Sequence, residues 1–288
     1  MALNENVKPI WLASYPKSGN TWTRLFFTAL LKETVNINDI QTDGIISARN
    51  IIDSQLGIDS SDITEKDFLK YRTRIYHSWC ESHVQKEYLL MKVHDACVRE
   101  GYVFFPPEIT RGTVYILRNP FDMVASTANH HNVSNEKAVQ MICSNLHALA
   151  SPGNKLNIQV SQYLGTWSYH LQSWENVHRD NMLLIRYEEM KSQPLETFSK
   201  LVNYIGLDYT SDQISKAIDE VSFSKIQQQE NEKAFKEAPK NTKQFFRSGK
   251  VGGWRDEITE DQIKLIIDSN YQSLLKHGYI SKEGEVLV

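Results

Sequence analysis

Residues 10–22, IWLASYPKSGNTW, decide the fold of this chain. Their first five residues form a short apolar run, which predicts a buried strand that stops at Pro16. From Thr21 to Leu31 the apolar residues recur at close to helical spacing, so a helix is expected directly after the turn. The first N–H groups of a helix have no partner within it and carry partial positive charge. Lys17 adds a full charge, and the turn is therefore predicted to bind an anion such as phosphate.

Strands and helices are expected to alternate along the rest of the chain. Short runs at Tyr88–Val93, Thr113–Leu117 and Met182–Ile185 are rich in aliphatic, β-branched or aromatic residues and predict further strands. Helical patterns cover residues 135–149, 166–177, 194–205, 211–221 and 259–275. Such alternation favours an α/β fold with a central parallel β-sheet flanked by helices. We expect a single domain over residues 1–288.

Other segments lack a clear pattern. Residues 36–75 are polar and predict short helices and loops, and IYHSWCESH at 75–83 is ambiguous. The stretch SPGNKLN at 151–157 predicts a loop. Residues 225–244 are charged, Gln-rich and poor in aliphatic residues, so we expect a mobile flap or an extended segment there.

Composition and charge exclude several classes of protein. The chain has 288 residues, of which 41% are hydrophobic and 23% charged, as in ordinary globular proteins. A net charge of −3 indicates no affinity for nucleic acid or an anionic membrane. Cys80, Cys97 and Cys143 show neither metal-ligand spacing nor an even disulfide set, so reduced thiols are expected. We see no secretory signal and no membrane span, and expect a cytoplasmic protein.

Two later segments could complete an anion site. Arg118 follows the strand at 113–117, where ligand-binding residues of parallel sheets gather, and Ser126 lies two helical turns on. Residues 245–254, FFRSGKVGGW, combine basic residues with glycines that allow backbone amides to approach an anion. Taken by itself, an arginine at a strand end, such as Arg118, more often forms a surface ion pair. A glycine-rich segment by itself is more often a flexible turn. The pattern G-x-x-x-x-G-K-[ST] is missing at 15–22, so this is a phosphate loop of another kind.

These three segments together resemble the motifs of sulfotransferases that use 3′-phosphoadenosine 5′-phosphosulfate (PAPS), most closely the cytosolic-type and bacterial ones. YPKSGNTW at 15–22 resembles the loop for the 5′-phosphosulfate end of PAPS. RNPFDMVAS at 118–126 resembles the 3′-phosphate segment, and RSGKVGGW at 247–254 the C-terminal RKGxxGDW signature. The resemblance implies the P-loop-nucleotide-kinase-like sulfotransferase fold, with PAPS as donor, its product PAP, and no metal.

The resemblance also implies roles for single residues. His94, in MKVHD, falls at the position of the catalytic base, and Lys17 and Lys92 at positions that contact the transferred group. We expect an in-line displacement in which His94 takes the proton of an acceptor hydroxyl or amine. The residues expected to bind PAPS are Lys17, Ser18, Gly19, Asn20, Thr21, Trp22, Arg118, Ser126, Tyr187, Ser222, Phe223, Phe246, Arg247, Ser248 and Gly249.

The chain departs from the family pattern at several positions. Asn20 replaces the usual Thr, Gly253 replaces Asp, and Ser248 replaces Lys, which removes one charge near the expected 3′-phosphate. We therefore predict weaker nucleotide affinity than a lysine would give. The C-terminal dimer motif K-x-x-x-T-V-x-x-x-E keeps only Thr259 and a basic residue, so we expect a monomer or a dimer that does not use it.

The identity of the small-molecule acceptor stays open at this stage. Its pocket is expected from residues 32–85, 130–165 and 225–245. His130 and His131 could line this pocket or be exposed. The aromatic residues Tyr76, Trp79, Phe104 and Phe105 could form an apolar wall of the pocket or belong to the core. Two other functions compete with sulfotransfer: a phosphotransferase that uses a nucleoside triphosphate and Mg²⁺, and a nucleotide-binding module without activity. The first lacks its Gly-Lys-[ST] signature, and retention of Lys17 and His94 argues against the second.

Overall fold

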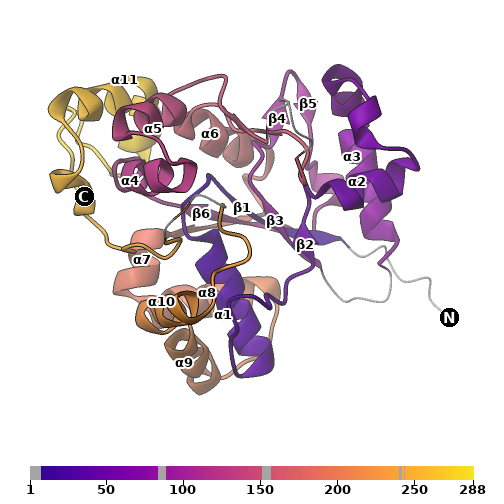
Figure 1. The fold of residues 1–288 in the computed structure, drawn as a ribbon, viewed down its shortest axis with the longest axis horizontal. Coiled ribbons are helices and arrows are strands. Elements are labelled where there is room, and N and C mark those ends of the chain that lie inside the picture. Colours follow the sequence, from indigo (N-terminus) through magenta and orange to yellow (C-terminus); the bar gives the residue numbers. More distant parts are fainter. Residues whose placement is uncertain (1–7, 84–88, 151–156, 240–241, 243) are drawn as a thin grey trace.

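A five-stranded parallel sheet forms the centre of the protein (Figure 1). The computed structural model describes residues 8–83, 89–150, 157–239, 242 and 244–288. The strand order is β2-β3-β1-β6-β9. These strands are β1 Pro9–Ser14, β2 Gly44–Ile45, β3 Leu89–Val93, β6 Gly112–Leu117 and β9 Met182–Arg186. Two antiparallel pairs lie outside the sheet: β4 Val98–Arg99 with β5 Tyr102–Val103, and β7 Ala148–Leu149 with β8 Gln162–Tyr163.

Helices cover both faces of the sheet, as Figure 1 shows. One face carries α1 Asn20–Lys32, α8 Pro194–Ile205, α9 Ser211–Glu220 and α10 Phe223–Glu232. The other carries α3 Glu65–Glu81, α4 Pro120–His131, α5 Asn135–Ile142, α6 Trp167–Val177 and α11 Glu260–Lys276. The remaining helices are α2 Arg49–Leu56, α7 Tyr187–Ser192 and three short 3₁₀ turns, η1 Ser60–Asp62, η2 Pro107–Ile109 and η3 Gly253–Asp256. The predicted parallel α/β architecture is confirmed.

The pleat of β1 explains why two hydrophobic cores form. All six residues of this central strand are buried. Trp11 and Ala13 belong to the core beneath α4, α5, α6 and α11, whereas Ile10 and Leu12 belong to the core beneath α1, α8 and α9. Successive side chains of a strand point to opposite faces, so a continuous apolar run suits a strand covered on both sides.

The parallel register brings the carboxyl ends of four strands to one edge of the sheet. Ala13 of β1 pairs with Val93 of β3, and Ser14 pairs with Ile116 of β6. Leu117 of β6 pairs with Arg186 of β9. The segments that follow these strands therefore lie side by side, and they contain Lys17, His94, Arg118 and Tyr187. Ligands of open parallel sheets bind at this edge.

Two expectations about the elements need correction, and the structure resolves one ambiguous stretch. The helix predicted over 135–149 ends at Ile142, and Ala148–Leu149 pairs with β8 instead. The ambiguous stretch at 75–83 mostly belongs to α3, a seventeen-residue helix that buries Ile75, Tyr76 and Trp79. Residues 225–232 of the predicted flap belong to the helix α10, because Lys, Gln and Glu are good helix formers and Ile226 anchors the helix in the core. Tyr88 and most of the predicted loop at 151–157 lie outside the described residues.

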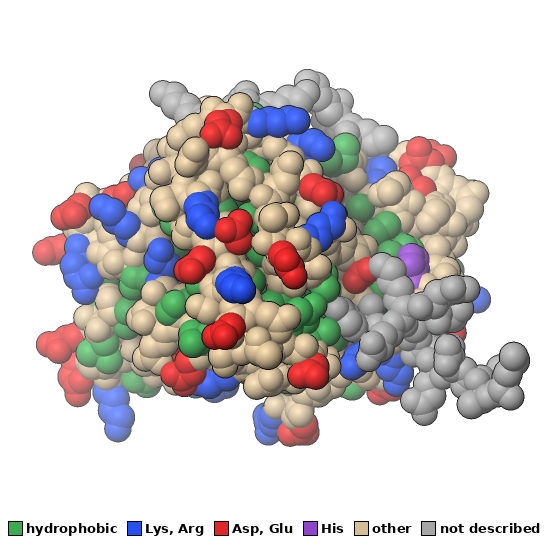
Figure 2. Space-filling view, turned by 90° about the horizontal axis from the view of Figure 1, so that it is seen from below, with side chains coloured by type: hydrophobic (Ala, Val, Ile, Leu, Met, Phe, Trp, Pro, Cys, Tyr) green, Lys and Arg blue, Asp and Glu red, His purple; other side chains and the backbone are tan. Residues whose placement is uncertain are grey.

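The charge distribution agrees with the small net charge of the chain. On the face seen from below, acidic and basic side chains are interspersed (Figure 2). All three cysteines are free; Cys80 and Cys97 are buried and Cys143 is half-buried. No helix in the described part of the chain has the length and apolar character needed to cross a membrane.

A buried ion pair lies directly beneath the edge of the sheet. Arg72 of α3 donates from Nη2 to Oδ2 of Asp95 at 2.6 Å, and both side chains are at most 1% exposed. The Nε of Arg72 also donates to the hydroxyl of Tyr76, and its guanidinium lies 4.5 Å from the centre of the Phe104 ring. Because Asp95 follows His94 in the chain, this pair fixes the backbone that carries His94.

We expect Arg72→Met to lower the free energy of unfolding by about 3–5 kcal/mol, since the substitution leaves the Asp95 carboxylate buried without its partner. Urea unfolding measures this loss. An unchanged slope of the unfolding free energy against urea concentration shows that only stability has changed. Arg74→Met, at an exposed position of the same helix, is the matched control and should stay within about 0.5 kcal/mol of wild type. Equal stability of the two variants would contradict this account of the pair.

Candidate active site

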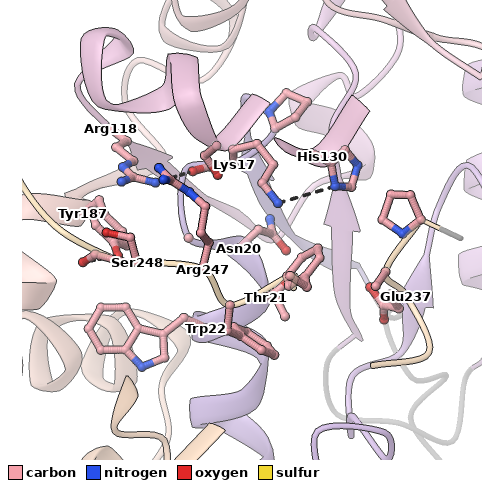
Figure 3. A pocket seen from close by; sticks show the side chains of 18 of the residues that line it. Lys17, Asn20, Thr21, Trp22, Arg118, His130, Tyr187, Glu237, Arg247 and Ser248 are labelled. Carbon is pink, nitrogen blue, oxygen red and sulfur yellow. Dashed lines mark hydrogen bonds between the residues drawn. The ribbon is translucent and has the colours of Figure 1, made fainter. Parts of the chain in front are cut away.

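A cavity of about 1170 Å³ opens at the carboxyl edge of the sheet and gathers most of the predicted site residues (Figure 3). His94 and Lys92 line it, together with Lys17, Gly19, Asn20, Thr21, Trp22, Arg118, Ser126, Tyr187, Phe223, Phe246, Arg247, Ser248 and Gly249. Two predicted residues do not line it. The Ser18 side chain is buried and donates to Sδ of Met123 at 3.7 Å, and Ser222 precedes α10 as its N-cap residue.

The turn between β1 and α1 has the backbone shape of an anion-binding loop. Lys17 and Gly19 both have positive φ, 72° and 108°. A Cβ added to Gly19 would lie 2.8 Å from Cδ2 of Tyr187, so only glycine fits there without displacing that ring. Asn20 turns its side chain back and donates from Nδ2 to the Leu12 carbonyl at 3.0 Å, which ties the turn to β1. Asn20 therefore braces the loop, and the first N–H groups of α1 remain for a ligand.

Lys17 is half-buried and lines the cavity (Figure 3). Its Nζ lies 3.5 Å from Nδ1 of His130 and 3.9 Å from the centre of the Phe245 ring. Burial, with the nearby charges of Arg118 and Lys92, lowers the pKa of Lys17 to about 7. An anion placed beside Lys17 would raise that pKa and be held by the resulting charge.

His94 is oriented as a proton acceptor. Its Nδ1 lies 2.9 Å from the Ser14 carbonyl oxygen, so Nδ1 carries the proton and donates it. Nε2 is then the nitrogen with a free lone pair. Burial, with Lys92 next in size, lowers the pKa of His94 well below its usual value, so the ring is neutral at neutral pH. The His94 carbonyl accepts from Nε2 of His170 at 3.0 Å, and Nδ1 of His170 accepts from the Tyr115 hydroxyl at 2.8 Å.

Lys92 is held by an acidic residue from the opposite side of the cavity. Glu237 binds Arg24 of α1 through both oxygens at 2.7 and 2.8 Å, and its Oε2 lies 3.6 Å from Nζ of Lys92. Burial lowers the pKa of Lys92 to about 8. The hydrogen bond from Arg24 and the charges of Lys92 and Arg24 outweigh burial and lower the pKa of Glu237 to about 2. Lys92 thus carries a compensated charge beside His94.

Arg118 joins the three predicted motifs. It donates from Nη1 to the Lys17 carbonyl at 2.9 Å and from Nη2 to the Lys250 carbonyl at 3.2 Å. Its guanidinium lies 4.2 Å from the centre of the Tyr187 ring, and the Tyr187 hydroxyl donates to the Gly249 carbonyl at 3.0 Å. Within the described residues its Nε has no hydrogen-bond partner although it is buried. Arg118 therefore positions both loops.

The same end of the cavity contains aromatic and basic side chains (Figure 3). Trp22 donates from Nε1 to the Val221 carbonyl at 3.0 Å and meets the Tyr187 ring edge-on. Arg247 pairs with Glu257 at 3.0 Å. Lys191 also lines the cavity. This combination suits a ligand with an aromatic ring and phosphate groups.

The structure adds residues that the sequence did not identify as part of the site. Asp122 accepts from the backbone N–H groups of Gly252 and Trp254 at 2.8 and 3.1 Å, and so fixes the C-terminal loop; its place inside RNPFD was the available signal. Gln162 and Glu237 belong to the segments expected to form the acceptor pocket, although no motif singled out either residue, and no sequence signal marked Lys191. Across the part of the chain that the structure describes, no group of three or more His, Cys, Asp or Glu side chains could hold a metal.

The four aromatic residues considered for an apolar wall are core residues. Tyr76 and Phe105 stack at 5.3 Å between ring centres, and Phe104 and Phe105 are fully buried. Trp79 is 7% exposed on α3. None of the four lines the cavity. His130 does line it, whereas His131 does not.

Comparisons with known proteins agree on one family. The family model described as "Sulfotransferase domain" matches residues 8–278. Cytosolic sulfotransferase 1 of Arabidopsis thaliana is 26% identical over 272 residues, which cover 90% of this chain and 77% of the relative. Flavonol 3-sulfotransferase of Flaveria bidentis is 25% identical over 281 residues, which cover 89% of this chain and 78% of the relative.

Solved structures show the same fold. A mouse sulfotransferase, SULT7A1, complexed with PAP superposes with a TM-score of 0.57 at 18% identity, over 98% of this chain and 89% of that one. Retinol dehydratase in a complex with retinol and PAP gives a TM-score of 0.58 at 18% identity, over 93% of this chain and 81% of that one.

The Glu237–Arg24 pair generates a prediction about stability and pH. We expect Glu237→Gln to lower the free energy of unfolding at pH 7 by about 1–3 kcal/mol, less than for a fully buried pair because Glu237 is partly exposed. The pKa of Glu237 in the folded protein, about 2, lies below the ordinary 4.5. The charge of Glu237 therefore contributes fully to stability above about pH 5, and this contribution is lost as the pH falls towards 2.

Chemical unfolding of both proteins at pH 7 and pH 3 measures the effect, and the difference between them should be smaller at pH 3. Glu196→Gln, which breaks an exposed ion pair with Lys200, is the control and should change stability by less than about 0.5 kcal/mol. A loss for Glu237→Gln that is independent of pH would show that the charge of Glu237 is not what stabilises this segment.

Proposed function

The chain belongs to the sulfotransferase domain family, and on this premise we propose that it transfers the sulfuryl group of PAPS to a hydroxyl or amine of a small-molecule acceptor. One observation carries the proposal: His94, with its Nε2 free, lies with Lys17 and Lys92 in a cavity that also contains Arg118 and Arg247. A cytoplasmic location is part of the proposal, supported by relatives named as cytosolic sulfotransferases.

The donor would bind at the end of the cavity formed by the three motifs. Arg118, Ser126, Arg247, Ser248 and Gly249 would hold the 3′-phosphate. Arg118 fits this role, because it is a basic residue that lines the cavity where the two loops meet. The structures that superpose on this chain with PAP bound support the choice of nucleotide.

The remaining donor contacts would come from α1 and its neighbours. Lys17, with the N–H groups of Gly19, Asn20 and Thr21, would hold the 5′ end, as helix N-termini hold phosphate. Trp22 and Phe223 would contact the adenine ring. The backbone of Gly249 lies close to the Phe223 ring, because a Cβ added to Gly249 would be 2.8 Å from that ring.

The chemistry would follow from the positions of three side chains. His94 would accept the proton of the acceptor hydroxyl at Nε2, and its low pKa keeps that nitrogen unprotonated at neutral pH. Lys17 and Lys92 would stabilise the negative charge on the leaving phosphate and on the sulfonyl oxygens. Glu237 would keep Lys92 charged, because it raises the pKa that burial lowers.

We predict that His94→Ala lowers kcat with PAPS by about 10²–10⁴-fold, the usual contribution of a general base. The Kd for PAP should change little, because His94 is not among the residues expected to bind the nucleotide. Initial rates with labelled PAPS and calorimetric titration with PAP measure the two effects. His77→Ala, on the exposed side of α3, is the control. Near wild-type turnover of His94→Ala would rule out its role as base, and PAP binding without turnover by the wild type would indicate a nucleotide-binding module.

A second prediction concerns Ser248, where the family carries Lys. Ser248→Lys should tighten PAP binding about 5- to 30-fold, since it adds one charged donor beside the expected 3′-phosphate. Val251→Lys adds the same charge at an exposed position that does not line the cavity, and should leave the Kd almost unchanged. Equal affinities of Ser248→Lys and the wild type would show that Ser248 does not weaken nucleotide binding.

A further inference from the structure

Lys191 is a basic residue at the nucleotide end of the cavity that belongs to none of the three motifs. It lines the cavity from α7. Its Nζ lies 5.5 Å from the centre of the Trp22 ring and 5.8 Å from the centre of the Phe223 ring. Both distances are within the range over which a cation is attracted to an aromatic face. Lys191 therefore lies beside the two rings that are expected to contact adenine.

The short helix α7 places Lys191 near Arg118. Tyr187 begins this helix and Lys191 follows it by four residues, so both side chains lie on the same side of α7. The guanidinium of Arg118 lies 4.2 Å from the centre of the Tyr187 ring. Partial removal from water, with the charge of Arg118 next in size, lowers the pKa of Lys191. The two cations are close enough to repel each other, and an anion bound by both would relieve that repulsion.

The charge of Lys191 has no protein partner of opposite sign. Among the residues that the structure describes, no carboxylate forms an ion pair with it. Arg247, by contrast, pairs with Glu257 at 3.0 Å. Ser248 lines the same end of the cavity and stands where the family carries a lysine, so one charge beside the expected 3′-phosphate is missing from the motif loop. Lys191 is thus a cation available to a ligand at the place where the motifs lack one.

We propose that Lys191 is a further donor-binding residue, whose ammonium group binds the 3′-phosphate of PAPS and supplies the charge that Ser248 does not. This role rests on the proposed function, because it takes PAPS as the donor. Lys191 is exposed, so a ligand in the cavity can reach its ammonium group. A residue that holds the nucleotide equally well before and during transfer changes the KM for PAPS and leaves kcat unchanged.

Calorimetric titration with two nucleotides tests this role: PAP, and adenosine 5′-phosphate, which lacks the 3′-phosphate. We expect Lys191→Met to weaken PAP binding about 5- to 30-fold, since it removes one charged donor. Binding of adenosine 5′-phosphate should change less than about twofold. Lys191→Arg keeps the charge and should bind PAP nearly as well as the wild type. Lys216→Met, at an exposed position of α9 that does not line the cavity, is the matched control for the lost charge.

A double variant tests whether Lys191 and Ser248 act on the same phosphate. Adding Ser248→Lys to Lys191→Met should restore most of the lost affinity for PAP. Initial rates should show a higher KM for PAPS in Lys191→Met with kcat at the wild-type level. Lys250 also lines the cavity and is the competing source of charge. A loss of PAP affinity in Lys250→Met, with none in Lys191→Met, overturns the role of Lys191.

The remaining outcomes separate this role of Lys191 from the proposed function. PAP affinity of Lys191→Met equal to that of Lys216→Met overturns the role and leaves the proposed function intact. An equal loss for PAP and adenosine 5′-phosphate also overturns it, because the contact is then not with the 3′-phosphate. Failure of the wild type to bind PAP or to consume PAPS overturns the proposed function, and the role of Lys191 with it.

Discussion

The parallel pairing of β1 with β3 and β6 is the constraint on which the site depends. It places Ser14, His94 and Arg118 at one edge of the sheet, so that the imidazole of His94 reaches the Ser14 carbonyl and Arg118 reaches the Lys17 carbonyl. A side chain anchored to a neighbouring strand end loses little freedom when a ligand binds, because the sheet has already fixed it. The ion pair of Arg72 with Asp95 secures the same edge from below.

Positive charge is concentrated in the cavity of a chain whose net charge is −3. Lys17 and Lys92 are both half-buried, and their removal from water lowers the pKa of each towards neutrality. Nearby carboxylates oppose this shift: Glu237 raises the pKa of Lys92, and the charge of Glu230 raises that of Lys17. The electrostatics of the unliganded protein therefore favour an anionic ligand beside Lys17, in the same cavity as the neutral His94.

The two halves of the cavity differ in chemistry. The half formed by the three motifs combines Arg118 and Arg247 with the rings of Trp22, Tyr187 and Phe223, which suits a nucleotide. The other half is built from segments without a motif, and its walls carry amides and charges. Relatives named for a flavonol and for retinol share the fold with this chain.

The sequence by itself determined the α/β class, the strand–turn–helix at 10–31 and the family, because apolar periodicity and glycine-containing turns are local properties. It also identified Lys17 in the turn after the first predicted strand and Arg118 directly after a later one, and the family resemblance identified His94 and Lys92. Only the tertiary structure decided that Glu237 and Gln162 face the same cavity as His94, and that Tyr76 and Phe105 are core. Those placements depend on contacts between residues far apart in the chain, such as Glu237 with Arg24. No local pattern encodes such contacts.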